Sequence, residues 1–411
     1  MKKILLSMVL ICGLSTFAQR TCATDAKTAA KMADPQFAAH HQEVMDYIKN
    51  PNLQNRFNDA SAPSVVVTIP VVFHVLYKTF GQNISDAQID SQLAILNQDF
   101  RKLNTDYNTT PAVFQNVGAD TEIVFCKAAQ TPAGVASNGV TRKQVPSTFV
   151  FEDQYYLAAG EPAWDPTKYL NIWIGRFSDP NLLGFAYYPS NAGQADDGLC
   201  IGDQYFGNVG TATAPFNLGR TGTHEIGHYF GLPHMWGNGG CGSVATGADG
   251  IADTPNTTGP YFGCPSFPTN TNACTSSANG SMFMNYMDYV DDACMVMFTN
   301  GQKTVMQNAI AGPRASLLTS NGCVSLGLDE AQTLQAIAVY PNPVSQYFMI
   351  TSPHVTIDLV EVYNTNGQLV KTQKLEEVNN KVFIDEFQSG VYYLRIYSDG
   401  KFLKSDKIVK K

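Results

Sequence analysis

The spacing of apolar residues changes along the chain, and each change marks a different structural element. Residues 65–77 are almost all apolar and rich in β-branched and aromatic side chains, which predicts a buried core strand. From Ser85 the apolar positions instead recur at helical spacing, which predicts a helix that begins there. Its apolar face is formed by Ile89, Leu93, Leu96 and Phe100.

Three further apolar stretches predict more strands. Residues 122–128 and 169–174 are expected in the sheet interior, and residues 183–189 form an edge strand that can hold an extended peptide by backbone pairing. His74 lies within the first apolar strand, where a hydrogen-bonded core histidine is favoured over a metal ligand. Strands mixed with helices indicate an α+β unit, here residues 61–325.

The chain changes character after Cys323. Residues 326–336 are polar and predict a linker. Residues 337–411 contain short alternating stretches with Asn-Gly and Asp-Gly pairs, at Asn366 and Asp399, which are typical of hairpin turns. This pattern predicts a small antiparallel β-sandwich.

The N-terminus carries an export signal. Lys2 and Lys3 precede an apolar run that ends in small residues, which predicts a secretory signal peptide over residues 1–18 with cleavage after Ala18. The apolar run is too short to span a membrane, and no other stretch is long enough, so no span is expected in the mature form. Residues 19–60 are polar and suggest one amphipathic helix.

Composition narrows the functional classes. The chain has 411 residues, a formal net charge of −8 and a pI near 5.3, which argues against nucleic acid as a partner. Its apolar content of 44% is ordinary for globular domains. Nine cysteines in an exported chain are compatible with disulfide formation.

One short segment carries candidate chemistry. Residues 224–234 read His-Glu-Ile-Gly-His-Tyr-Phe-Gly-Leu-Pro-His and contain three of the chain's seven histidines. Residues four apart lie on one helix face, so His224 and His228 can bind the same ion. Gly231 can take a positive φ, end the helix and bring His234 back as a third ligand.

Three protein ligands leave the fourth zinc position open for water, as in a catalytic rather than a structural site. Zinc lowers the pKa of this water from about 16 to roughly 7. Glu225 directly follows the first ligand and is placed to take the proton of that water. The segment therefore predicts a catalytic zinc ion with Glu225 as general base.

The extended motif resembles that of the metzincin metallopeptidases. Their second signature is a tight turn with a methionine beneath the zinc, and residues 282–289, Met-Phe-Met-Asn-Tyr-Met-Asp-Tyr, supply it. Met287 is the best candidate for the turn methionine, with Met282 and Met284 as alternatives. This turn and the Gly-Leu-Pro-His-Met-Trp segment at residues 231–236 are similar to the pappalysin family and its ulilysin-like members. The resemblance implies a mixed sheet with a backing helix and a zinc-binding active-site helix.

The resemblance also implies two residues that act on the substrate. In the family a tyrosine two residues after the turn methionine steadies the oxyanion, and Tyr289 matches it. The alternative is an ordinary half-buried tyrosine. An acidic residue slightly further on selects arginine, and less strongly lysine, just after the scissile bond. Asp292 matches that position better than Asp291, and a carboxylate pairs well with a guanidinium, although a solvated loop acid is the alternative.

Four cysteines near this region resemble two overlapping disulfides of the family. The implied pairs are Cys241 with Cys274 and Cys264 with Cys294. Sequence alone permits three connectivities for four cysteines, so the pairing comes from the resemblance. Cys126, Cys200 and Cys323 stay unassigned.

Residues 247–255 resemble a calcium-binding segment of ulilysin-like enzymes. Carried over by position, the ligands are Asp249, Thr254 and the carbonyl of Ala252, with Asp253 nearby. Oxygen-rich loops of this kind suit calcium. Without the resemblance, an Asp-Gly turn bonded to its own side chains explains the segment nearly as well.

Residues 19–60 resemble the short pro-segment of these enzymes. Within them Cys22 follows Arg20, and its thiolate would be a good fourth zinc ligand that displaces the catalytic water and keeps the precursor inactive. The alternative is that Cys22 pairs with one of the leftover cysteines. Arg56 is a candidate for a self-cleavage that activates the enzyme.

Residues 337–411 resemble the type IX secretion sorting domain. Tyr-Pro-Asn-Pro at residues 340–343, Ser-Gly-Val-Tyr-Tyr-Leu at residues 389–394 and the lysine-rich end carry this resemblance. It implies recognition by the type IX machinery after passage to the periplasm, and export across the outer membrane to the cell surface or the extracellular space. The alternative is a carbohydrate-binding or adhesive sandwich.

Together these features predict a secreted zinc endopeptidase that cleaves proteins or peptides, prefers arginine or lysine after the scissile bond and is made as a latent precursor. The alternative is a catalytically silent cell-surface binding protein on a metallopeptidase scaffold. Glu225 argues against that alternative, because a pure binder needs no base beside the metal. A zinc-dependent amidase acting on small substrates is a third hypothesis.

Overall fold

The computed structural model describes residues 20–50, 66–237, 241, 248–324, 337–352, 356–375, 380–398 and 400–411. The signal peptide predicted at residues 1–18, Arg56 and the linker predicted at residues 326–336 lie outside the described residues. The chain divides into two compact units, Met1–Ser325 and Leu326–Lys411. Among the described residues, no helix has the length and apolar character needed to cross a membrane.

A mixed sheet of seven strands forms the centre of the first unit, in the order β1-β6-β7-β5-β2-β3, with β4 also paired to β2. The strands are β1 Thr21–Cys22, β2 Val67–Tyr77, β3 Ile123–Lys127, β4 Val140–Gln144, β5 Leu170–Gly175, β6 Leu182–Ala186 and β7 Leu199–Gly202. The central strand β2 is parallel to β3, β4 and β5, whereas β6 runs antiparallel to β7. Strand β1, which lies in the segment expected to be a pro-segment (residues 19–60), pairs in parallel with β6. It therefore covers the edge where an extended substrate was expected.

The apolar stretch of β2 is continuous because both faces of this strand are covered. Val71, Val72 and Phe73 are successive residues that point to alternate faces, and all three are fully buried. His74 lies among them and is a core residue. Its two ring nitrogens are hydrogen-bonded to the Thr141 hydroxyl at 2.8 Å and to the Asn171 side-chain oxygen at 2.9 Å.

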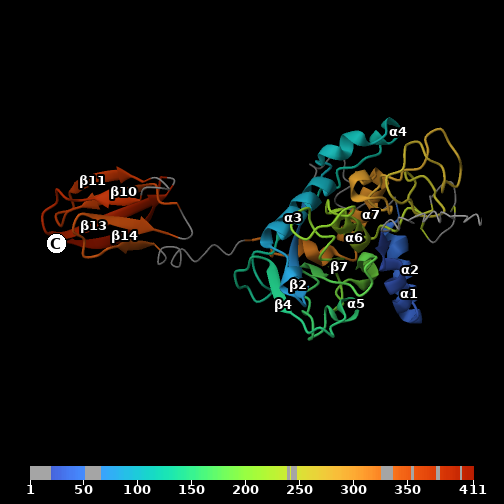
Figure 1. The fold of residues 1–411 in the computed structure, drawn as a ribbon, viewed down its shortest axis with the longest axis horizontal. Helices are drawn as coiled ribbons and strands as arrows, with labels where there is room; N and C mark the ends of the chain where they lie inside the picture. The colour runs from blue at the N-terminus through green and yellow to red at the C-terminus, as the bar shows by residue number, and fades with distance from the viewer. Residues whose placement is uncertain are drawn as a thin grey trace, which may run out of the picture. The chain divides into compact units, whose positions relative to one another are not determined.

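Helices cover this sheet and line the site (Figure 1). They are α1 Thr24–Lys31, α2 Pro35–Ile48, α3 Asp86–Phe100, α4 Ala112–Gln115, α5 Phe151–Gln154, α6 Arg220–Tyr229 and α7 Asn300–Ala311. Short 3-10 turns are η1 Phe80–Gln82, η2 Thr105–Thr109, η3 Pro189–Asn191, η4 Asp292–Cys294 and η5 Ala315–Thr319. The predicted helix after Ser85 is α3, and the Ser85 hydroxyl caps it by accepting from Gln88 N–H at 3.2 Å. α3 packs against α6, which carries the histidine motif.

The pro-segment contains two helices where one was expected. α2 starts with Pro35 directly after Asp34, whose carboxylate accepts from Gln36 N–H at 2.9 Å. α2 packs against α7, and α1 packs against β6 (Figure 1). The sequence of α1 has few apolar residues, so its apolar pattern did not predict a helix.

The second unit is a small β-sandwich, as predicted. One sheet has the order β11-β10-β13-β14 and the other β12-β9-β8, with antiparallel pairing throughout. The strands are β8 Ala338–Tyr340, β9 Tyr347–Thr351, β10 Leu359–Tyr363, β11 Leu369–Lys374, β12 Lys381–Phe383, β13 Gly390–Ser398 and β14 Lys401–Lys410. Inward residues such as Phe348, Val360 and Leu394 form its core.

Candidate metal centre

The histidine motif converges on one point. His224 and His228 lie one turn apart on α6, and Gly231 turns the chain with a φ of 96° so that His234 returns to the same place. His228 Nε2 lies 3.1 Å from His224 Nε2 and 3.1 Å from His234 Nε2. The Cys22 sulfur joins this cluster, and all four ligand atoms lie within 4.8 Å of one another.

The opposite nitrogens of the three rings each face an acceptor. His224 Nδ1 donates to the Tyr286 carbonyl at 2.7 Å, and His228 Nδ1 donates to the Leu232 carbonyl at 2.6 Å. His234 Nδ1 donates to the Asp25 carboxylate at 2.8 Å. These acceptors carry no proton, so each ring is protonated on Nδ1 and presents a bare lone pair on Nε2.

Bare lone pairs that face one another in a buried space repel unless a cation lies between them. Extra protons do not fill this role, because burial lowers the pKa of His228 to about 3 and also lowers that of His224. Three imidazoles and a thiol are ligands that suit zinc. The residues present therefore fit the metal that the motif predicts.

Glu225 lies beside this cluster, between α6 and the edge strand. Its Oε2 accepts from the Cys22 thiol at 3.4 Å and from the Thr24 hydroxyl at 3.4 Å. Burial raises the pKa of Glu225 to about 8. A Cβ on Gly184 of β6 would lie 2.9 Å from the Glu225 side chain, so only glycine leaves room for this carboxylate beneath the strand.

The turn at residues 282–289 brings Met287 under α6, the helix that carries His224 and His228. A Cβ on Gly227 would lie 2.4 Å from the Met287 sulfur, which places the sulfur directly against the helix backbone. The neighbouring carbonyl of Tyr286 holds His224, so the turn also orients a ligand. Met282 and Met284 are buried as well, and Met282 accepts a weak hydrogen bond from Asn285.

Tyr289 points at the same cluster. Its ring lies 5.0 Å from the His234 ring and 5.7 Å from the His224 ring, centroid to centroid. Its hydroxyl accepts from Cys22 N–H at 3.2 Å and donates to the Cys22 carbonyl at 3.4 Å. The pro-segment backbone therefore occupies the position that this phenol can reach.

Asp292 lies in η4 and is fully buried. Its Oδ2 accepts from Leu218 N–H at 2.9 Å and from Arg220 N–H at 3.3 Å, which fixes the carboxylate. Its Oδ1 forms a buried ion pair with Arg20 of the pro-segment. The Arg20 guanidinium also lies over the Phe216 ring, 5.1 Å from its centroid. Asp291 is only half-buried, and no hydrogen bond or ion pair with Arg20 is described for it.

The cysteines form three disulfides in the described part of the chain. They join Cys241 to Cys274, Cys264 to Cys294 and Cys126 to Cys323. Cys22 and the buried Cys200 are free. The third disulfide uses two of the cysteines that the sequence left unassigned, so Cys22 remains available to the metal cluster.

The structure brings two of the three expected calcium ligands together. The Thr254 hydroxyl lies 2.8 and 2.9 Å from the two carboxylate oxygens of Asp249, and Ile251 N–H donates to the same carboxylate at 3.0 Å. Ala252 is exposed and makes no described contact with them. Asp253 faces the other way, where it accepts from Thr299 and Gly301 at the start of α7.

Two contacts of the pro-segment were not anticipated from the sequence. They are the ion pair of Arg20 with Asp292 and the hydrogen bond of Asp25 to His234. The short separation of Arg20 from Cys22 and of Cys22 from Asp25 was visible, but nothing local indicated their partners.

Comparisons with known proteins agree with this geometry. The family described as pregnancy-associated plasma protein-A matches residues 153–311, and the secretion system C-terminal sorting domain matches residues 338–411. An extracellular metalloprotease of Verticillium alfalfae is 30% identical over 246 residues, which cover 57% of this chain and 73% of that protein. One from Colletotrichum graminicola is 28% identical over 76% of this chain and 98% of its own length.

Two solved structures from Tannerella forsythia are similar over the first unit. Mature mirolysin in complex with a cleaved peptide is 42% identical, with a TM-score of 0.59, over 62% of this chain and 97% of that one. A promirolysin mutant is 39% identical, with a TM-score of 0.64, over 73% of this chain and 97% of that one.

Proposed function

Because the chain belongs to the pappalysin family of metzincin zinc metallopeptidases and carries a type IX sorting domain, we propose that it is the latent precursor of an endopeptidase that cuts before arginine. Its class is that of a secreted zinc metalloendopeptidase. The proposal adds the substrate preference, the latency and the role of each residue.

Three histidines, His224, His228 and His234, would hold the catalytic metal. When bound there, zinc supplies Lewis acidity and a water of lowered pKa. Glu225 then accepts a proton from the water and returns it to the leaving amine. Tyr289 donates a hydrogen bond to the oxygen on which negative charge develops.

The preference for arginine rests on the pair of Arg20 with Asp292. A buried carboxylate already fixed by the amides of Leu218 and Arg220 has one oxygen left for a cation. In the precursor a guanidinium takes that oxygen and stacks on Phe216. We propose that an arginine of the substrate replaces Arg20 there, and that lysine, with a single ammonium, binds more weakly.

Latency follows from the same pro-segment. Arg20 fills the pocket, the Cys22 thiol lies at the metal cluster, and β1 pairs with the edge strand β6. Thr24 extends this blockade, because its hydroxyl reaches Glu225 and also accepts from Ala186 N–H at 2.9 Å. One related structure is described as a pro form and another as mature, which supports a precursor here.

The direction of the chain explains why the pro-segment is not itself cut at the metal. In a substrate with arginine after the scissile bond, the reacting carbonyl comes before that arginine in the chain. In the pro-segment the residue at the metal cluster, Cys22, comes after the arginine in the pocket. The pro-segment therefore crosses the cleft in the opposite direction and presents no scissile carbonyl in the productive order.

The remaining assignments are parts of the same proposal. Met287 forms the apolar floor of the site, and Asp249, Thr254 and the Ala252 carbonyl bind a structural calcium ion. The signal peptide at residues 1–18 and pro-segment at residues 19–60 precede the catalytic domain at residues 61–325. A linker at residues 326–336 joins it to the sorting domain at residues 337–411, which the type IX machinery recognises.

The experiment is cleavage of a mixed peptide library by the matured protein, with a zinc chelator and Glu225→Ala as controls. Metal-dependent cuts before arginine are expected. Cuts before other residues would leave the peptidase intact and discard the Asp292 pocket. A preparation that holds zinc and has lost residues 19–60, yet cleaves nothing, would favour the silent binding protein.

A further inference from the structure

The pro-segment contacts the metal centre at a second point besides Cys22. We propose that Asp25 is an outer-sphere residue of the zinc site, which orients His234 and strengthens metal binding in the precursor alone. This inference rests on the proposed zinc site and pro-segment. It makes the precursor the form in which the metal is loaded and held most tightly.

The three ligand histidines differ in what supports them. His224 and His228 are held by the carbonyls of Tyr286 and Leu232, which belong to the catalytic domain and remain after activation. His234 Nδ1 donates instead to Asp25 Oδ2 at 2.8 Å. Within the part of the chain that the structure describes, no other acceptor faces this nitrogen.

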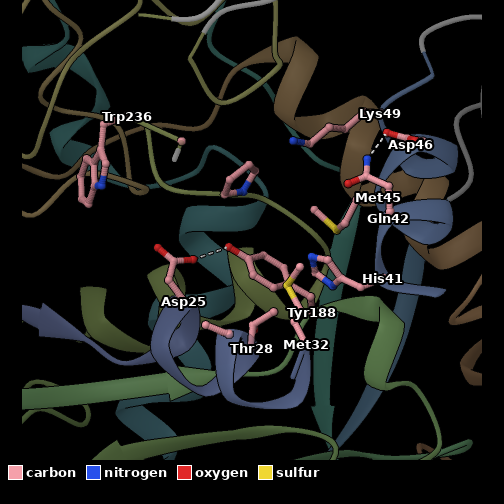
Figure 2. Close-up of a pocket in the computed structure, with 13 residues that line it drawn as sticks. Asp25, Thr28, Met32, His41, Gln42, Met45, Asp46, Lys49, Tyr188 and Trp236 are labelled. Atoms are coloured by element: carbon pink, nitrogen blue, oxygen red, sulfur yellow. Dashed lines mark hydrogen bonds between the residues drawn. The ribbon is translucent and has the colours of Figure 1, made fainter. Parts of the chain in front are cut away.

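The Asp25 carboxylate is anchored on its other side. Asp25 Oδ1 accepts from the Tyr188 hydroxyl at 3.2 Å, a contact drawn in Figure 2. Asp25 lies in the first turn of α1, where the helix dipole favours an anion. The Asp25 carboxylate thus bridges His234 and Tyr188, which follows the edge strand β6. This one side chain links the pro-segment to both residues.

The rings around His234 fix the plane of its imidazole, so the only freedom left to it is a half-turn about the Cβ–Cγ bond, which exchanges Nδ1 with Cδ2 and Nε2 with Cε1. The imidazole stacks on Trp236 at 4.6 Å between centroids with an interplanar angle of 3°, and the Tyr289 ring meets it edge-on. These contacts fix the ring plane but leave Nδ1 unsatisfied. The hydrogen bond to Asp25 therefore selects, of the two flipped orientations, the one that points Nε2 at the metal.

A carboxylate on the far nitrogen also makes the imidazole a stronger donor. Loss of such an outer partner typically lowers metal affinity by about 10- to 100-fold. When residues 19–60 leave, Asp25 leaves with them. The cavity of about 640 Å³ that Asp25 lines beside α1 and α2 (Figure 2) then loses the walls that these helices supply, and water becomes the partner of His234.

The test compares full-length precursors that also carry Glu225→Ala, so that self-cleavage cannot remove the pro-segment. Asp25→Asn keeps the shape of the side chain and removes its charge. Asp46→Asn is the matched control, because Asp46 is also exposed, lines the same cavity and bonds only to Gln42 among described residues. Zinc retention is measured by titration with a competing chromogenic chelator.

We expect Asp25→Asn to lower zinc affinity about 10- to 100-fold and Asp46→Asn to leave it unchanged. A second readout separates this effect from loosening of the pro-segment. In the cobalt-substituted precursors, the absorption band of a Cys22 thiolate bound to the metal reports that the pro-segment is docked. Weaker zinc binding with this band retained supports the proposal.

Unchanged zinc affinity in Asp25→Asn would overturn it, and so would a loss of affinity that occurs only together with loss of the thiolate band. In the second case Asp25 would act in docking, not on His234. Either failure leaves the proposed peptidase untouched, because its test uses the matured enzyme, which lacks Asp25.

Discussion

The buried ion pair of Arg20 with Asp292 makes a quantitative prediction about latency. The two side chains are 1% and 0% exposed, so removing one partner leaves the other charged and desolvated. Breaking a pair of this kind costs about 3–5 kcal/mol. Since each 1.4 kcal/mol is a factor of ten, Arg20→Ala should favour the undocked pro-segment by roughly 100- to 5,000-fold.

The assay is the lag before a freshly purified precursor cleaves a fluorogenic peptide with alanine after the scissile bond, a substrate that does not use the Asp292 pocket. Arg20→Ala and Asp292→Asn should both shorten this lag, and the double variant should add little, because the two substitutions remove the same interaction. The amide that replaces the Asp292 carboxylate keeps an oxygen for the Leu218 N–H, so the fold of the pocket is retained. Lys27→Ala is the control for a basic residue of α1 with partly exposed contacts, an ion pair with Asp153 and a hydrogen bond to the Glu152 carbonyl at 2.7 Å, and it should shorten the lag far less than Arg20→Ala.

The matured enzyme provides the second half of the test. Asp292→Asn should lower kcat/KM for peptides with arginine after the scissile bond by about 100-fold or more, and should affect peptides with alanine there far less. Asp291→Asn should behave like the parent. If Asp292→Asn matches Asp291→Asn in both assays, the pocket does not bind arginine and this reasoning is wrong.

Three further predictions follow from other parts of the first unit. Tyr289→Phe should lower kcat by roughly 100- to 1,000-fold with little change in KM, because one hydrogen-bond donor to the oxyanion is lost. Steady-state kinetics of the matured enzyme would measure this, and an unchanged kcat would refute the role of Tyr289. Replacing Cys126 and Cys323 by alanine opens a loop of 197 residues and should cost about 2–5 kcal/mol in unfolding experiments, whereas equal stability would show the disulfide to be dispensable. Burial raises the pKa of Asp288 to about 7. The folded chain therefore holds this proton more tightly than the unfolded chain, and stability should fall as the pH rises from about 4 through 7, by on the order of 4 kcal/mol. Urea unfolding at pH 5 and pH 8 should show about 3 kcal/mol of this loss in the parent and not in Asp288→Asn, and equal pH dependence would contradict it.

The convergence of the three histidines was predictable because its geometry is local. His224 and His228 are set by the helical repeat, and Gly231 supplies the turn that returns His234, so eleven residues encode the site. The core strands were predictable for a related reason. A strand that is buried on both faces, such as β2, is apolar at nearly every position, so its sequence alone indicates a buried strand.

The contacts between residues far apart in the sequence could not be predicted from such local patterns. Arg20 and Asp292 are 272 residues apart, and neither has neighbours that reveal the other. Cys126 and Cys323 are 197 residues apart, and an odd number of leftover cysteines cannot say which one stays free. β1 has only two residues and is a strand solely because β6 offers it a partner.

The pairing of β1 with β6 has a consequence for solubility. An edge strand with unpaired amide and carbonyl groups is a template for association with other chains, and β6 is almost entirely apolar. In this structure β1 pairs with β6 and so covers part of this edge. Once the pro-segment is gone, the same groups are open to any extended polypeptide. If residues 19–60 are removed as proposed, the edge that receives a substrate would also be open to pairing with another chain.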